Sequence, residues 1–175
     1  MLKKIIIIIS IIVLITLLFI PLFPRLILNS VKNNKVNMIL NIKKKDFIIS
    51  YNHSVNKSKV RDYYMIDKDN NIILEKTRFV SYGAGIPEPE EDENFVIIDD
   101  YMEINNMNRI IEHLYLFTGV TANHTIMTDE RIIELDNFFE PQTNIRIEYK
   151  KISIFEYIRA FLLRITHRWQ YEKQE

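Results

Sequence analysis

The chain has no cysteine among its 175 residues. Disulfides, thiolate metal sites and cysteine nucleophiles are therefore excluded, and the fold must depend on packing and hydrogen bonds alone. Glycine is almost as scarce, with three in the whole chain. Each glycine is therefore expected where the backbone needs positive φ or where another segment approaches closely. The net charge of +0 gives no sign of a nucleic-acid partner.

A long apolar run is present at the start of the chain. Residues 5–20 are apolar apart from Ser10 and Thr16, and about 20 such residues span a hydrocarbon core of about 30 Å. Lys3 and Lys4 precede the run and predict a cytoplasmic N-terminus with the rest of the chain outside. We expect a single-pass signal anchor in the cell membrane over residues 1–24. A cleaved signal peptide and a buried core helix are the alternatives; a cleavage site of small residues is lacking.

The middle of the chain has the pattern of short strands. Apolar runs alternate with charged turn sequences, and no helical period persists. After a linker at residues 25–35, this pattern predicts a mainly β domain over residues 36–151, an antiparallel β-sandwich or barrel-like fold. The expected strands are Val36–Ile42, Phe47–His53, Val60–Ile66, Ile72–Ser81, Phe95–Ile98, Arg109–Phe117, His124–Met127, Arg131–Leu135 and Asn144–Lys150.

The last segment, residues 152–175, changes to a helical period. Its apolar residues fall on one stripe, flanked by basic residues, so a basic amphipathic helix is expected. Residues 150–175 carry a net charge of +3, whereas residues 25–149 carry −5. The helix is suited to covering the sheet, to lying on a bilayer or to docking on a partner. The stripe consists of Ile154, Ile158, Phe161, Leu162, Ile165 and Trp169.

Two of the glycines, Gly83 and Gly85, lie in the stretch Ser81–Pro87 directly after a long β run. This position predicts a sharp exit from a strand. The stretch is not a G-x-G-x-x-G motif and no helical pattern follows it, so a nucleotide site is not expected. A structural turn and a ligand contact both remain open.

A polar cluster is expected between neighbouring strands. A hairpin centred near residues 56–57 places Tyr51 and His53 opposite Asp62 and Val60, which gives Asp62 an inward-facing parity. An inward carboxylate needs a partner, and the next turn brings Arg78 close. We therefore predict a His53–Asp62–Arg78 cluster, either structural or a site for a small organic anion.

The spacings required for catalysis or metal binding are missing. Ser54 follows His53 directly, so in a strand the two side chains point to opposite faces, and only His124 remains as a base for a hydrolase. The four histidines show no H-x-x-x-H spacing. Residues 67–71 imitate an EF-hand start but predict a hairpin turn. The acidic run 88–93 is expected to be a solvated loop, with weak calcium binding as the alternative. We expect no catalytic residue, metal or cofactor.

The stretch Tyr51–Val55, then Val60 and Asp62, and then the glycine stretch Ser81–Pro87 follow one another along the chain. In this order they resemble the family called domain of unknown function 1850, over roughly residues 36–147. The resemblance implies a small exported domain, often encoded beside TRAP transporters of the TAXI type, with no established activity. The acidic insert and the basic tail depart from the family pattern. The residues that carry the resemblance are Tyr51, His53, Ser54 and Val55, then Val60 and Asp62, then Ser81, Gly83, Ala84, Gly85 and Pro87, and later His124, Ile126 and residues 132–135.

The sequence therefore predicts a membrane-anchored, extracytoplasmic, non-catalytic accessory module associated with a TRAP-type transporter. An autonomous domain that binds a small anion is the alternative. The candidate ligand-binding residues are His53, Ser54, Asp62, Arg78, Gly83, Gly85 and His124.

Overall fold

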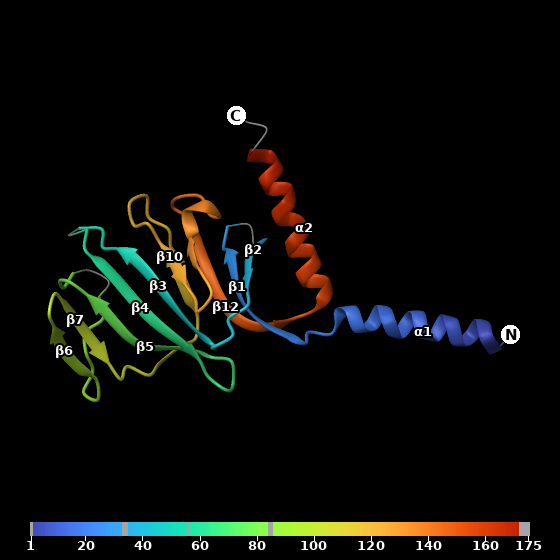
Figure 1. Ribbon diagram of the computed structural model, residues 1–175, viewed down its shortest axis with the longest axis horizontal. Helices are drawn as coiled ribbons and strands as arrows, with labels where there is room; N and C mark the ends of the chain where they lie inside the picture. The colour runs from blue at the N-terminus through green and yellow to red at the C-terminus, as the bar shows by residue number, and fades with distance from the viewer. Residues whose placement is uncertain (1, 33–34, 56, 84–85, 172–175) are drawn as a thin grey trace. The chain divides into compact units, whose positions relative to one another are not determined.

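The computed structural model describes residues 2–32, 35–55, 57–83 and 86–171 (Figure 1). The contacts divide the chain into two units. One unit joins Met1–Arg25 to Lys150–Glu175, and the other is Leu26–Tyr149.

The first unit contains two helices. Helix α1, Leu2–Phe19, is long and apolar enough to cross a membrane, a property that membrane anchors and signal sequences share. Helix α2, Ile154–Tyr171, begins with a capping box in which Ser153 and Glu156 bond to each other's backbone N–H. The rings of Phe19 and Phe155 lie 4.8 Å apart. The predicted helix after residue 151 is therefore confirmed.

The second unit is built around two antiparallel sheets. In the described part of the chain, the smaller sheet has the order β2-β1-β12-β9 and the larger has the order β11-β10-β3-β4-β5-β7-β6, with β8 also pairing with β5. The strands are β1 Phe23–Ser30, β2 Lys35–Leu40, β3 Asp46–Asn52, β4 Lys59–Ile66, β5 Ile72–Phe79, β6 Asn94–Ile98, β7 Tyr101–Asn105, β8 Arg109–Ile111, β9 Leu114–Phe117, β10 Thr125–Met127, β11 Ile132–Glu134 and β12 Asn144–Ile152.

Both sheets contribute side chains to one hydrophobic core. In strands such as β4, alternate residues point inward, as the period of two requires. Each fully buried aliphatic side chain contributes about 1.5–3 kcal/mol relative to leaving it in water. The core includes Leu26 and Leu28 of β1, Phe47 and Ile49 of β3, Val60 of β4, Phe79 of β5, Ile104 of β7, Ile126 of β10, and Ile145 and Ile147 of β12. The mainly β, antiparallel fold predicted from the sequence is confirmed, and of the two forms left open, a sandwich or a barrel-like domain, the strands form two sheets.

Three parts of the strand prediction are wrong. Residues 25–30 of the predicted linker belong to β1. The apolar residues of β1 follow closely on the N-terminal apolar run, so the sequence showed no boundary between the helix and the first strand. The single strand expected at residues 109–117 is two strands, β8 and β9, which lie in different sheets. Strand β7 was not expected. It forms a hairpin with β6 around Asp99, which adopts a φ of 47°.

Strand β5 carries a β-bulge that reverses its side-chain parity. Tyr63 pairs with Lys76 and Tyr64 pairs with Leu74, so Glu75 is the extra residue. The Glu75 carbonyl accepts a 3.1 Å hydrogen bond from the backbone N–H of Met107. Because one inserted residue exchanges the two faces beyond it, Thr77 rather than Arg78 points inward.

Candidate functional site

His53 and the glycine turn lie against each other, as far as the described residues show. The His53 side chain is buried at the end of β3, and a Cβ added to Gly83 would lie 2.6 Å from both Cε1 and Nε2 of its ring. Real Cβ atoms do not approach other atoms so closely. The glycine is therefore required by close approach, which is one of the two roles expected of it.

The orientation of the His53 ring is fixed by the backbone. The N–H of Val55 donates a 3.2 Å hydrogen bond to Nδ1. The ring proton is therefore assigned to Nε2, on the side that Gly83 faces. The backbone N–H of His53 donates to Ser58 and its carbonyl accepts from Lys57, so the turn that holds the ring is itself well bonded.

Asp62 faces inward, as predicted, but its partner is Thr77. Asp62 pairs across the sheet with Ile49 on one side and Thr77 on the other. The predicted pairing of Tyr51 with Asp62 is wrong by two residues, since Tyr51 pairs with Val60. A shift of two residues leaves the side chains on the same face, so the inward direction of Asp62 is unaffected. The Thr77 hydroxyl donates a 2.9 Å hydrogen bond to Asp62 Oδ1. Burial raises the pKa of Asp62 from 3.8 to about 6, although the bond from Thr77 works in the opposite direction.

Two tyrosine rings lie near this carboxyl, and a histidine ring stacks on one of them. Burial, and then the negative charge of Asp62, raise the pKa of both Tyr51 and Tyr64. The Tyr51 ring stacks on His124 with centroids 5.5 Å apart. Burial lowers the pKa of His124 below its ordinary value, and the charge of Asp136 offsets only part of this shift. We name this set (Tyr51, Asp62, Tyr64, Thr77 and His124) the inner polar cluster. Among the described residues, His124 Nδ1 has no hydrogen-bond partner.

Arg78 lies on the opposite face of the sheet, so the predicted His53–Asp62–Arg78 cluster is wrong. Arg78 pairs with Arg61 on β4 and with Glu103 on β7. Its guanidinium donates a hydrogen bond to Glu103 and lies 4.9 Å from the ring centroid of Tyr101. Burial disfavours the charged form of Glu103, yet the bond from Arg78 and the charges of Lys76 and Arg78 outweigh this and lower its pKa.

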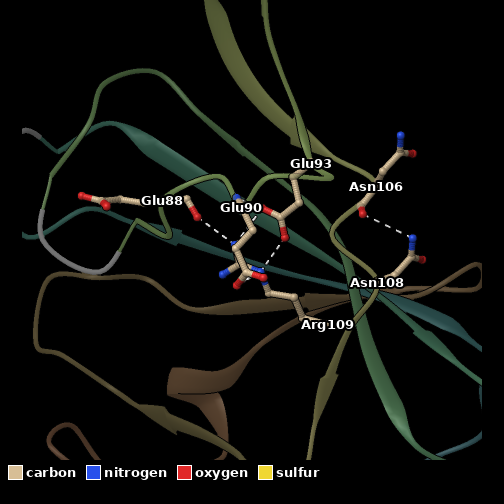
Figure 2. A network of polar contacts seen from close by, with 6 residues as sticks. All are labelled: Glu88, Glu90, Glu93, Asn106, Asn108 and Arg109. Atoms are coloured by element: carbon tan, nitrogen blue, oxygen red, sulfur yellow. Dashed lines mark hydrogen bonds and ion pairs between the residues drawn. The ribbon is translucent and has the colours of Figure 1, made fainter.

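The acidic run is anchored by an arginine that the sequence gave no reason to single out. Arg109 of β8 makes a two-pronged ion pair with Glu93, with Nε 2.6 Å and Nη2 2.7 Å from the two carboxylate oxygens (Figure 2). Arg109 Nη2 also donates to the Glu88 carbonyl, and the Glu93 side chain is only 3% exposed. A fully solvated loop is therefore not what the structure shows. In the described ranges, no group of three or more potential ligands is placed to hold a metal ion.

Arg109→Met should lower the free energy of unfolding by about 1 kcal/mol, because Glu93 loses a bidentate partner. The hydrogen bond from Arg109 holds the pKa of Glu93 below its usual value. The stabilisation should therefore be present above the unfolded pKa of Glu93 and be lost as the pH falls through the folded pKa. Urea unfolding at several pH values measures this. Glu90→Gln is the matched control, since that carboxylate also lies 3.3 Å from Arg109 Nε but its side chain is 70% exposed, so the pair should contribute little. An equal loss in both variants would contradict the anchor.

The remaining predicted site residues are dispersed. Ser54 is exposed in the turn after β3, and within the described ranges no hydrogen bond joins it to His124. Gly85 lies outside the described residues. A cavity of about 60 Å³, lined by Asn29, Val31, Tyr115 and Arg146, lies on the smaller sheet.

The structure thus defines a class: a two-sheet β domain that carries an inner polar cluster and a His–Gly junction, in a chain that begins with an apolar helix. The family model described as a domain of unknown function (DUF1850) matches residues 47–135, slightly more than half of the chain. The protein belongs to this family. The matched region runs from β3 to β11, so β1, β2 and β12 of the smaller sheet lie outside it. No curated protein matches, and no solved structure does either.

Proposed function

We propose that the protein is a non-catalytic accessory module that acts at the cell membrane beside a TRAP-type transporter for small organic solutes. The observation that carries the proposal is the connection between α1 and the β domain. Helix α1 ends at Phe19 and β1 begins at Phe23. Three connecting residues reach at most roughly 14 Å, which is too short for a flexible spacer. A β domain that follows so directly on an anchor supports a partner at the membrane.

Family membership supports the choice of partner. The motifs shared with the family lie in the larger sheet and at the His53–Gly83 junction, and the resemblance links such domains to TAXI-type TRAP transporters. The alternative, a site for a small anion, relied on Arg78 as the cation beside His53 and Asp62. Arg78 faces away from Asp62, so that cation is missing from the inner polar cluster. The inner polar cluster instead presents a carboxylate, which repels an anion.

The topology is tested first. Lys3 and Lys4 favour a cytoplasmic N-terminus and an external β domain. Protease added to intact spheroplasts should therefore digest residues 26–149 and leave a short N-terminal fragment. Complete protection of the β domain until the membrane is permeabilised would contradict this topology.

The transporter association is tested by uptake. Deleting the gene should reduce uptake of one or more solutes in a panel of radiolabelled carboxylic acids. The full chain should restore uptake. A variant with a flexible 20-residue insertion between Leu22 and Phe23 should not, although its β domain is intact and equally abundant. Normal uptake of the whole panel in the deletion strain, or full rescue by the insertion variant, would contradict the proposal.

A further inference from the structure

We propose that helix α2 lies in the surface of the lipid bilayer, with its apolar face among the acyl chains. The inference rests on the proposed membrane anchorage by α1 and goes beyond it, since it assigns a second membrane-binding element. The occupant of the apolar face is lipid rather than the β domain or another protein.

The described part of α2 leaves its apolar side chains uncovered. No apolar residue between 154 and 162 is buried. The exposed fractions are 37% for Ile154, 45% for Phe155, 49% for Tyr157, 48% for Ile158, 58% for Phe161 and 55% for Leu162. A contiguous exposed apolar surface of this kind marks a binding face.

These residues form one face of the helix. Phe155, Ile158 and Leu162 are spaced by three and four residues, which places them on one stripe. Ala160 lies on the opposite side at 100° per residue. The predicted continuation of the stripe, Ile165 and Trp169, lies outside the residues whose side chains are described.

Continuity with α1 identifies the occupant. Phe19 is the last residue of α1, and its ring lies 4.8 Å from that of Phe155 in the first turn of α2. If α1 crosses the membrane, Phe19 lies where the chain leaves the apolar layer, and Phe155 lies at the same depth. The exposed face of α2 thus starts next to a helix whose own side chains are all exposed and apolar enough for lipid.

The charge distribution fits the same occupant. Residues 150–175 carry a net charge of +3, which attracts anionic headgroups. Glu156 is the acidic residue in the first turn of α2. Its carboxylate is part of the helix cap, since it accepts hydrogen bonds from the N–H and the hydroxyl of Ser153. A cationic helix with an uncovered apolar face has the composition of an interfacial helix.

Because the chain has no cysteine, single spin labels can test the inference in the full chain. The variants are Ile158→Cys and Leu162→Cys on the apolar face, Ala160→Cys on the opposite side, and Ile8→Cys in α1. Each is reconstituted into nanodiscs of phosphatidylcholine with phosphatidylglycerol. The measurement is collision of the label with oxygen, which concentrates in lipid, and with a water-soluble nickel chelate.

Labels at 158 and 162 should show a several-fold higher ratio of oxygen to nickel collisions than the label at 160. Low collision rates with both reagents at 158 and 162 would mean that protein covers the face, and would overturn the inference. High nickel collision at those sites, equal to that at 160, would place α2 in water and would also overturn it. In both cases a lipid-exposed label at residue 8 leaves the anchorage by α1 intact. A water-exposed label at residue 8 would overturn both proposals.

Discussion

Gly83→Ala should lower the free energy of unfolding by about 2–3 kcal/mol, within the range for forcing a methyl group into space that another side chain occupies. The new Cβ would lie 2.6 Å from two atoms of the His53 ring. The ring cannot move aside easily, because it is buried and the Val55 N–H is bonded to its Nδ1. Urea unfolding of the full chain in mild detergent measures the loss.

Gly119→Ala is the matched control. There an added Cβ would meet only the Ala122 Cβ, at 3.5 Å, which is ordinary van der Waals contact. Its effect should stay within about 0.5 kcal/mol, as for a substitution away from any special feature.

A double-mutant cycle with His53 then identifies the cause of the Gly83 effect. In a His53→Ala background the ring is absent, so Gly83→Ala should cost much less than it does in the wild type. Equal costs in both backgrounds would show that Gly83 is required for a reason other than the approach of the ring.

Asp62→Asn should raise the free energy of unfolding at neutral pH by about 2 kcal/mol. The pKa of Asp62 is raised from 3.8 to about 6, chiefly by burial. By linkage, such a shift corresponds to at most about 3 kcal/mol of destabilisation when the group is ionised. Asparagine keeps an oxygen that accepts the hydrogen bond from Thr77 and removes the charge, although its amide must find partners, which reduces the gain.

The stability difference between Asp62→Asn and the wild type should depend on pH. The folded state holds the Asp62 proton more tightly than the unfolded state does, so the contribution of Asp62 to stability is largest below pH 4. That contribution is lost as the pH rises through about 6. The advantage of the Asp62→Asn variant over the wild type should therefore be small near pH 4 and complete above pH 7. An advantage that is the same at all pH values would contradict the burial of an ionisable carboxyl.

Asp67→Asn provides a control of opposite sign. Hydrogen bonds from Asn71 and from backbone N–H groups lower the pKa of Asp67, so its ionised form contributes to stability above its unfolded pKa. Removing that charge should destabilise the protein at neutral pH and matter less in acid. The two substitutions should thus give pH profiles with opposite signs.

Unfolding measurements on a double mutant test the separation of Asp62 from Arg78. Because the two side chains lie on opposite faces of the sheet, Asp62→Asn and Arg78→Met should be additive within about 0.5 kcal/mol. A larger coupling energy would show that Asp62 and Arg78 interact, as the cluster predicted from the sequence requires.

Local patterns in the sequence determined the hairpins and the apolar helix. The alternation in β3 and β4 fixed the inward face of Asp62, because the side-chain period of a strand is two and one face had to be apolar. The turn at residues 67–71 was determined by its own composition, since Asp67 accepts hydrogen bonds from the N–H groups of Asp69 and Asn71. The order of the His53 and Gly83 motifs was enough to indicate the family that the match to residues 47–135 confirms.

Only the tertiary structure decided which polar groups meet. By parity with Ile72 and Leu74, Arg78 belongs on the inner face. The bulge at Glu75 shifts the register by one residue, and its carbonyl is satisfied by Met107, about thirty positions away in the sequence. The contact of His53 with Gly83 and the ion pair of Arg109 with Glu93 likewise join segments from different hairpins. Such contacts depend on how strands pair and pack, and a pattern confined to one strand does not encode them.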